Sequence, residues 1–428
     1  MYFILAILLI FPFAAMGQTD DVKTLSWQEV LELARKHNPE LRAQYAALRA
    51  SRADYDGSRS GFYPQLVAGF DVTKSHRSSQ IDQADASERY DLSLSLRQNI
   101  FDGFADSQKV KKAKTAVNAS KLEVLTTKLR LGFDLVSSFS SLSFAQASEL
   151  LQEKIIGRRQ ENLNIVTLRF ENGRENKGSV LQSEAYLAAA RFELDKARQD
   201  QLVFKRELYS LIGLDKAEKE DKSWRQLTLN GVVPTEKPLA DESLDLKALA
   251  LLHPDVKLAR ARAAMAMADV GLSRARFYPS LETRAQYGLG DDSFFPNQSA
   301  WSISLGVSYP LYSGGADSAA LRKAKQSYLE AKLSVRASVN RQLDSLEKSL
   351  LSYRQAYAQL DVEKAFEKAA IVRAEIARSK YNNGLMSFEE WDRLESELMS
   401  RQKSVLRLER DLVQSYAAWL KAQGKGVL

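Results

Sequence analysis

The chain has 428 residues, of which 27% are charged, with a formal net charge of +7 and no cysteine. The absence of cysteine excludes a disulfide framework, a zinc–thiolate site and a lipid anchor on an N-terminal cysteine. The positive charge does not indicate nucleic-acid binding, because basic and acidic residues alternate along predicted helical faces, as in RFELDKARQDQLVFKREL from Arg191.

The first residues, MYFILAILLIFPFAAMGQ, form an apolar run that is too short to span a bilayer and ends in the small-residue pattern Ala15-Met16-Gly17. This pattern is typical of a secretory signal, so we expect residues 1–17 to be cleaved and the mature chain to begin at Gln18. No later segment has the unbroken apolar length of a transmembrane helix. An exported chain is therefore expected either to stay soluble outside the inner membrane or to enter a membrane as β-strands.

The rest of the sequence contains an internal duplication. The segment HNPELRAQYAALRASRADYDGSRSGFYPQL from His37 matches HPDVKLARARAAMAMADVGLSRARFYPSL from His253, and the two FYP steps lie 277 − 62 = 215 residues apart. We therefore predict a first structural repeat over residues 18–213, a connecting segment over 214–243 and a second repeat over 244–428. The connecting segment has no clear period, so it is predicted either to fold against the middle of the helices or to be a loose linker.

Each FYP step is followed by residues that alternate between apolar and polar. In YDLSLSLRQNIF from Tyr90, leucines and serines occupy alternate positions, and WSISLGVSYPLY from Trp301 repeats the pattern. Such a period of two predicts strands with one apolar and one polar face. We expect strands at about 65–75 and 89–101 in the first repeat and at about 280–290 and 300–312 in the second, so that each repeat holds one hairpin.

Very long helices are predicted next. No proline lies between Pro64 and Pro234 or after Pro310, and Leu343, Leu346, Leu350, Tyr353, Tyr357 and Leu360 recur in the heptad steps of coiled-coil packing. A helix from about Asp317 to Tyr381 would be about 100 Å long. The Asn-Gly pairs near residues 173 and 384 predict tight turns from which a second helix runs back, so each repeat is expected to end in a helical hairpin.

Four strands cannot close a membrane barrel, and an open sheet edge is not stable in lipid. Three chains that shared one barrel would supply twelve strands. Aromatic residues lie at the predicted strand ends, where a membrane-interface girdle is expected. These residues are Phe62, Tyr63, Phe101, Phe277, Tyr278, Trp301 and Tyr312.

The duplicated helix-FYP-hairpin-helix unit, the turns FDGFADS and YSGGADS after each strand pair, and the tip turns ENGREN and NNGLMS resemble the TolC family of outer-membrane efflux and secretion channels. The resemblance covers essentially the whole mature chain. It implies a mixed α and membrane-β fold: a homotrimeric, twelve-stranded β-barrel in outer-membrane lipid that continues into a long α-helical, coiled-coil periplasmic tunnel. It also implies a periplasmic adaptor (membrane fusion) protein and an inner-membrane transporter of RND, ABC or MFS type, which together with the channel form an efflux or type I secretion system.

The same resemblance places the working parts at the helical tips. Docking of the adaptor is implied for Gly173, Arg174, Gly384, Leu385 and Ser387. Acidic residues beyond the second tip line the closed end of the tunnel in this family, which here implies a pore constriction at Glu390 and Arg393, with Glu389 and Asp392 beside them. A mixed ring of this kind would be closed by Glu–Arg pairs between subunits. The alternative for Glu390 and Arg393 is an ordinary surface pair one helical turn apart.

A soluble periplasmic coiled-coil adaptor or scaffold is the alternative function that the sequence leaves open, since it would explain the heptads and the signal but not the paired amphipathic strands. An enzyme is not expected. His37, His76 and His253 are scattered, and no phosphate-binding loop, nucleophile motif or metal-ligand spacing is present, so no cofactor or metal is predicted. The cargo stays open among drugs, metal ions, solvents and unfolded protein.

Overall fold

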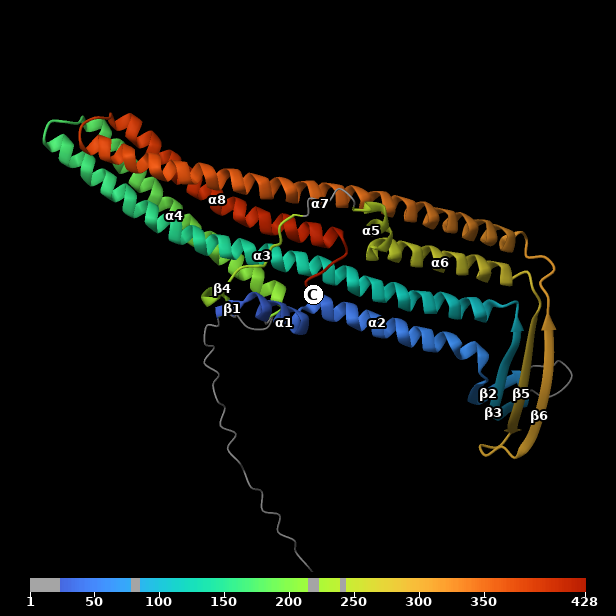
Figure 1. Cartoon of the computed structure of the whole chain (residues 1–428). Coiled ribbons are helices and arrows are strands. Elements are labelled where there is room, and N and C mark those ends of the chain that lie inside the picture. The colour runs from blue at the N-terminus through green and yellow to red at the C-terminus, as the bar shows by residue number, and fades with distance from the viewer. Residues whose placement is uncertain (1–23, 78–84, 215–222, 239–243) are drawn as a thin grey trace, which may run out of the picture.

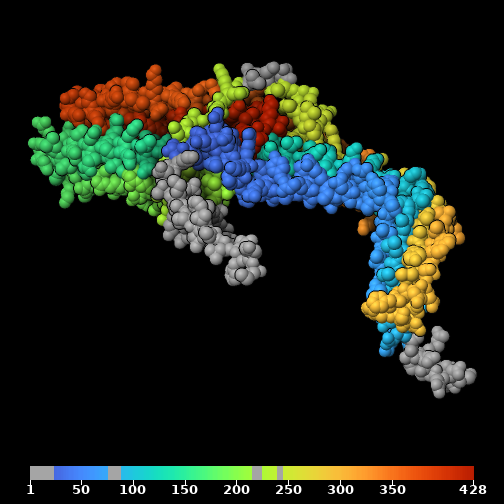
Figure 2. Space-filling view, turned by 90° about the horizontal axis from the view of Figure 1, so that it is seen from below, coloured from blue at the N-terminus to red at the C-terminus, as the bar shows by residue number. Residues whose placement is uncertain are grey.

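The computed structural model describes residues 24–77, 85–214, 223–238 and 244–428. The predicted signal peptide lies outside these residues, as do parts of the connecting segment. The molecule is a long helical rod with a small sheet at one end (Figure 1). The sheet projects from the rod as a narrow slab (Figure 2).

The two predicted repeats contain helices and strands in the same order. The first contains α1 (Trp27–His37), α2 (Pro39–Ser58), β2 (Gln65–Arg77), β3 (Asp85–Asp102), α3 (Ala105–Glu171) and α4 (Lys177–Ile212). The second contains α5 (Leu246–Leu252), α6 (Pro254–Ala275), β5 (Ser280–Asp291), β6 (Gln298–Ser308), α7 (Ala316–Asn382) and α8 (Phe388–Ala422). The helices α3 and α7 are both 67 residues long.

The strands form one antiparallel sheet in the order β2-β3-β5-β6. β6 ends at Ser308, four residues short of the predicted end near Tyr312, because Pro310 has no N–H to donate to a neighbouring strand. Among the described residues, the outer edges of β2 and β6 have no strand beside them. The sheet is therefore open on both sides.

Left-handed backbone conformations connect the strands to the long helices. Gly103 and Phe104 have φ values of 67° and 71° before α3, and Gly314 and Gly315 have 63° and 84° before α7. Glycine adopts this region without strain, whereas Phe104 pays a conformational cost of about 1 kcal/mol or more. The Phe104 ring packs 5.2 Å from that of Phe101 and 6.2 Å from that of Tyr278, which fixes it at the junction.

The core is divided along the rod. The largest cluster lies at mid-length, where Val30, Leu41, Leu135, Phe139 and Leu208 from α1, α2, α3 and α4 pack together. In a second cluster the predicted heptad of α7 packs on α8, and its alternate members Leu346, Tyr353 and Leu360 are buried. A third cluster lies under the helical tips.

The described part of the connecting segment packs on the rod. It contains a short 3-10 helix, η2 (Ser223–Gln226), and β4 (Thr228–Asn230), which pairs in parallel with β1 (Thr24–Ser26). Val233 is buried in the mid-length cluster, and the Tyr353 hydroxyl donates to the carbonyl of Glu236. These residues follow the first of the two predicted alternatives, folding against the helices.

Candidate functional site: the helical tips and the sheet

The two helical tips have the same turn. Gly173 and Gly384 both adopt left-handed conformations, with φ values of 70° and 74°. At the first tip the Arg174 N–H donates to the Arg169 carbonyl at 2.8 Å, and the corresponding bond at the second tip is 2.9 Å. This pattern satisfies carbonyls at the helix end and favours glycine. Because a Cβ on Gly173 would meet no atom within 4 Å, its backbone is open to a partner.

Beyond the second tip, Ser387 is the N-cap of α8. Its hydroxyl accepts a hydrogen bond from the Glu390 N–H at 3.2 Å. Glu389 and Glu390 lie in the first turn, where negative charge interacts favourably with the helix dipole. The sequence implied a docking role for Ser387, but the S-x-x-E spacing is also the signature of a helix start. Its hydroxyl is therefore engaged within the chain.

An aromatic cluster supports the tips from below. The rings of Tyr381 and Trp391 stack with centroids 4.3 Å apart, and the Arg169 guanidinium lies 4.4 Å above the Tyr381 ring. The Tyr381 hydroxyl donates to the Glu175 carboxylate at 2.8 Å. Burial and the nearby Glu175 carboxylate raise the pKa of Tyr381, so the phenol stays protonated. These contacts connect the α7–α8 hairpin to the α3–α4 hairpin.

Buried ion pairs extend this connection along the rod. Arg158 on α3 binds the fully buried Glu395 on α8, with its Nε 2.5 Å and its Nη2 2.9 Å from the two carboxylate oxygens. The neighbouring Arg159 donates from Nη1 to Asp392 at 2.8 Å. Arg378 on α7 places its Nε 3.7 Å from Glu395. The sequence analysis did not identify Glu395, although a glutamate among the apolar positions of α8 was an available signal.

The predicted constriction residues separate into two sets. Glu389, Glu390 and Arg393 are exposed, and within the described part of the chain Glu390 and Arg393 form no ion pair. Asp392 is buried against Arg159 and does not share this exposed face. Asp392 therefore does not belong with Glu389, Glu390 and Arg393 as a constriction residue. Its carboxylate is already paired with Arg159 inside the bundle. All five predicted docking residues are exposed, namely Gly173, Arg174, Gly384, Leu385 and Ser387.

The sheet has one apolar and one polar face. On the apolar face Leu94 lies opposite Tyr287, which in turn lies opposite Trp301. Many side chains on this face are exposed, with Trp301 at 74% and Ile303 at 70%. On the polar face, Arg97 and Arg284 bind the same carboxylate, that of Glu282, at 2.7 and 2.5 Å.

The predicted interface aromatics lie at two levels. Those at the helical end of the sheet are Phe62, Tyr63, Phe101, Phe277, Tyr278 and Tyr312. Trp301 does not belong to this level, because it lies near the start of β6, at the end of the sheet that is far from the helices. The sheet therefore has an aromatic level beside the rod and another toward its far end.

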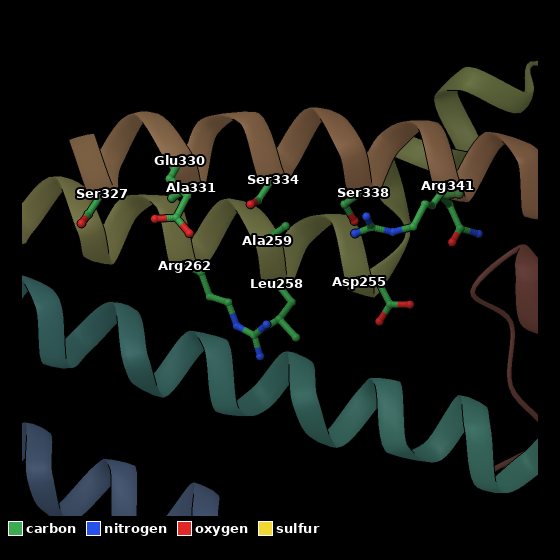
Figure 3. Close-up of a pocket in the computed structure, with 11 residues that line it drawn as sticks. Asp255, Leu258, Ala259, Arg262, Ser327, Glu330, Ala331, Ser334, Ser338 and Arg341 are labelled. Carbon is green, nitrogen blue, oxygen red and sulfur yellow. The ribbon is translucent and has the colours of Figure 1, made fainter. Parts of the chain in front are cut away.

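A surface groove of about 650 Å³ lies between α6 and α7 (Figure 3). Its wall contains Ser327, Ser334 and Ser338 on α7, and Arg262 on α6, which pairs with Glu123 on α3 at 3.1 Å. The groove does not bring together any of the predicted site residues. Among the described residues, no group of three or more histidine or carboxylate side chains is placed to hold a metal ion.

Long helical hairpins attached to an amphipathic antiparallel sheet are the features of an outer-membrane channel protomer. The chain belongs to the outer membrane efflux protein family, whose model matches residues 30–214 and 246–425. It is therefore an efflux channel protein of the outer membrane with a large helical part in the periplasm. This assignment decides against the alternative of a soluble periplasmic adaptor. No described helix combines the length and apolar character needed to cross a bilayer.

Individual proteins with similar sequences or structures support this family assignment. CyaE of Bordetella pertussis is 24% identical, with 96% of this chain and 84% of CyaE aligned. The pyoverdine export outer membrane protein OpmQ of Pseudomonas putida is 23% identical, with 93% and 85% aligned. The crystal structure of VceC from Vibrio cholerae has the same fold, with a TM-score of 0.83 at 20% identity over 94% of this chain and 96% of VceC.

Proposed function

We propose that three copies of this chain form one channel, in which their sheets close a twelve-stranded barrel and their helices form a periplasmic tunnel. The observation that carries this proposal is the sheet with two open edges and an exposed apolar face. An isolated sheet of this kind would leave backbone donors and acceptors unpaired in lipid.

The strand directions support closure between copies. Because neighbours in the order β2-β3-β5-β6 are antiparallel, β2 and β6 run in opposite directions. β6 of one copy can therefore pair with β2 of the next in the same antiparallel manner, and three copies of four strands give an even-numbered barrel. In this arrangement the face of Leu94 and Ile303 contacts lipid, and the face of Ser95 and Ser304 lines the lumen. The aromatic residues beside the rod then lie at the periplasmic membrane interface.

The helical tips provide the contact with the rest of an efflux system. The exposed residues Gly173, Arg174, Gly384 and Leu385 form the surface for a periplasmic adaptor, with Ser387 holding the start of α8. The energy for transport comes from an inner-membrane pump of RND, ABC or MFS type, and the channel conducts passively. A type I secretion system would use the same conduit for unfolded protein.

The exposed residues Glu389, Glu390 and Arg393 form the resting constriction in this proposal. Because Glu390 and Arg393 have no ion-pair partner within the described chain, each is available to a neighbouring subunit. A Glu–Arg pair across each of three subunit boundaries would hold the tips together. Such exposed pairs contribute little individually, and repetition makes the closed state modestly preferred.

The mass of the detergent-solubilised, folded protein tests the proposal. Light scattering corrected for bound detergent should give three times the mass of one chain, which is 48.0 kDa for the full sequence. The same sample after complete unfolding provides the control, since it should give one chain. The trimer should also form discrete conducting channels in planar bilayers. A folded, monodisperse monomer would contradict the shared barrel.

A further inference from the structure

The turn between β5 and β6 carries two neighbouring phenylalanines. The Phe294 ring packs edge-on against Tyr90 on β3, with centroids 5.5 Å apart, and against Phe70 on β2 at 6.4 Å. Phe295 lies 5.1 Å from Phe294 and is 83% exposed. These residues form a distal aromatic cluster, which we define as Phe70, Tyr90, Phe294 and Phe295.

The register of the sheet decides on which face the cluster lies. Phe70 is paired with Leu92, and Tyr90 is paired with Val72, so both belong to the apolar face. Phe294 therefore covers the far end of that face. Through Phe294, the turn between β5 and β6 reaches across this face to β3 and β2.

Local contacts hold the turn in this position. The Ser293 hydroxyl donates to the Phe295 carbonyl at 3.1 Å, and the Asp292 N–H donates to the Asp291 carboxylate at 2.8 Å. Pro296 restricts the backbone directly after the two phenylalanines. Phe295 is thus presented outward by an ordered turn, although exposure of a large aromatic side chain to water is unfavourable.

A charged pair lies beside the distal aromatic cluster, farther from the helices. Beyond Phe70 and Tyr90 on the same face, Lys74 pairs with Glu88 at 2.5 Å. The distal aromatic cluster lies between these charges and the apolar belt of the sheet. Aromatic residues are enriched at such a boundary and flank the apolar band of outer-membrane barrels at both interfaces.

We infer that the Phe294–Phe295 turn inserts into the outer leaflet of the outer membrane, at the boundary between headgroups and acyl chains, and anchors the far end of the barrel. This inference rests on the proposed orientation of the apolar face toward lipid. Its partner is the lipid surface, since the cluster lies on the apolar face of the sheet, which the proposed trimer turns toward lipid, and copies pair with one another only through the strand edges of β2 and β6. The anchor fixes the depth of the barrel from the outside, opposite the aromatic level beside the rod.

The absence of cysteine makes a direct test possible, because a single introduced cysteine can carry a spin label at one known position. Phe295→Cys is labelled in the full trimer, and the trimer is reconstituted into phosphatidylethanolamine–phosphatidylglycerol vesicles. Collision rates are measured with oxygen, which is concentrated in lipid, and with a water-soluble nickel chelate. Asp292→Cys on the same turn is the matched aqueous control, and Ile303→Cys on β6 is the control for the lipid face.

We expect the oxygen-to-nickel collision ratio at Phe295 to exceed that at Asp292 several-fold and to approach that at Ile303. A ratio at Phe295 equal to that at Asp292, with Ile303 in lipid, would overturn the anchor and leave the proposed channel intact. Low collision rates with both reagents at Phe295 would show that protein covers the turn, which also overturns the anchor. If Ile303 itself reports water, the proposed lipid face fails and the anchor fails with it.

Discussion

Arg158 and Glu395 form a two-bond ion pair although they are 237 residues apart in the sequence. Arg158 belongs to the first repeat and Glu395 to the second, so the pair joins the two halves of one protomer. Glu395 has no exposed surface, and its hydrogen bonds raise the pKa of the Arg158 guanidinium above its ordinary value. A buried carboxylate with this geometry costs much more to leave unpaired than it contributes when paired.

Replacing Arg158 by alanine should destabilise the folded chain by about 3–5 kcal/mol, because the fully buried Glu395 carboxylate would lose the guanidinium that binds it with two hydrogen bonds. The thermal unfolding midpoint of the solubilised protein, followed by circular dichroism, should fall clearly. Glu153→Ala provides the control, since Glu153 is 49% exposed and 3.3 Å from Arg198. That change should cost less than about 1 kcal/mol. Equal midpoints for both variants would show that the buried pair has no structural role.

The two faces of the sheet should tolerate charge differently. Leu94→Arg or Ile303→Arg should impair membrane insertion, by about 2–4 kcal/mol for a residue near the midplane, because the guanidinium would face lipid. Ser95→Arg, one residue from Leu94 on the opposite face, should insert normally. The measurement is the fraction of trimer recovered in the outer membrane. Similar recovery for Leu94→Arg and Ser95→Arg would mean that the faces are assigned incorrectly.

The proposed constriction can be opened by mutation. Glu390→Ala with Arg393→Ala should raise single-channel conductance in planar bilayers and increase the sensitivity of cells to large antibiotics. Trimer yield should be unchanged, because exposed ion pairs at the tips contribute little beside the shared barrel. The exchanged pair, Glu390→Arg with Arg393→Glu, should restore part of the closure. If the double alanine variant inserts normally and conducts like the parent, the constriction lies elsewhere.

Acid should weaken the junction of α5 and α6 through His253. This residue is buried, its Nδ1 accepts from the Asp255 N–H at 3.2 Å, and its Nε2 lies 3.2 Å from the Lys421 carbonyl. Burial lowers the pKa of His253 below 6.5, outweighing the attraction of the Asp255 carboxylate. The unfolded chain therefore binds a proton at a higher pH than the folded chain does.

This contribution to stability is complete above about pH 6.5 and is lost as the pH falls toward the lowered pKa, by at most about 1.4 kcal/mol per pH unit. His253→Asn retains a capping side chain without a titrating group. The thermal midpoint of the variant should depend less on pH in this range than that of the parent. Parallel profiles for the two proteins would exclude His253 as a source of acid sensitivity.

Much of the fold is predictable because its signals are local and repeated. The alternation of leucine and serine from Tyr90 indicates a strand without knowledge of its partner, and the heptad from Leu343 identifies the face of α7 that packs on α8. The end of β6 was placed too late, because the alternation continues through Tyr309 while pairing stops before Pro310.

The site was less predictable, because it depends on contacts between distant segments. Asp392 and Glu390 are both acidic residues near one tip, and nothing local shows that only Asp392 meets an arginine. Its partner Arg159 lies on another helix, 233 residues earlier. The burial of Glu395 has the same origin. The capping role of Ser387 could be predicted from the local sequence, since the S-x-x-E pattern needs no distant partner.

The open edges of the sheet also determine how the molecule can mature. In the proposed trimer a single chain can complete its helices, but β2 and β6 would gain their outer hydrogen bonds only when other copies arrive. The last step of folding is then a bimolecular reaction whose rate depends on protein concentration. Until that step, β6 exposes Trp301, Ile303, Leu305 and Val307 next to an unpaired backbone edge, which is a strong template for aggregation.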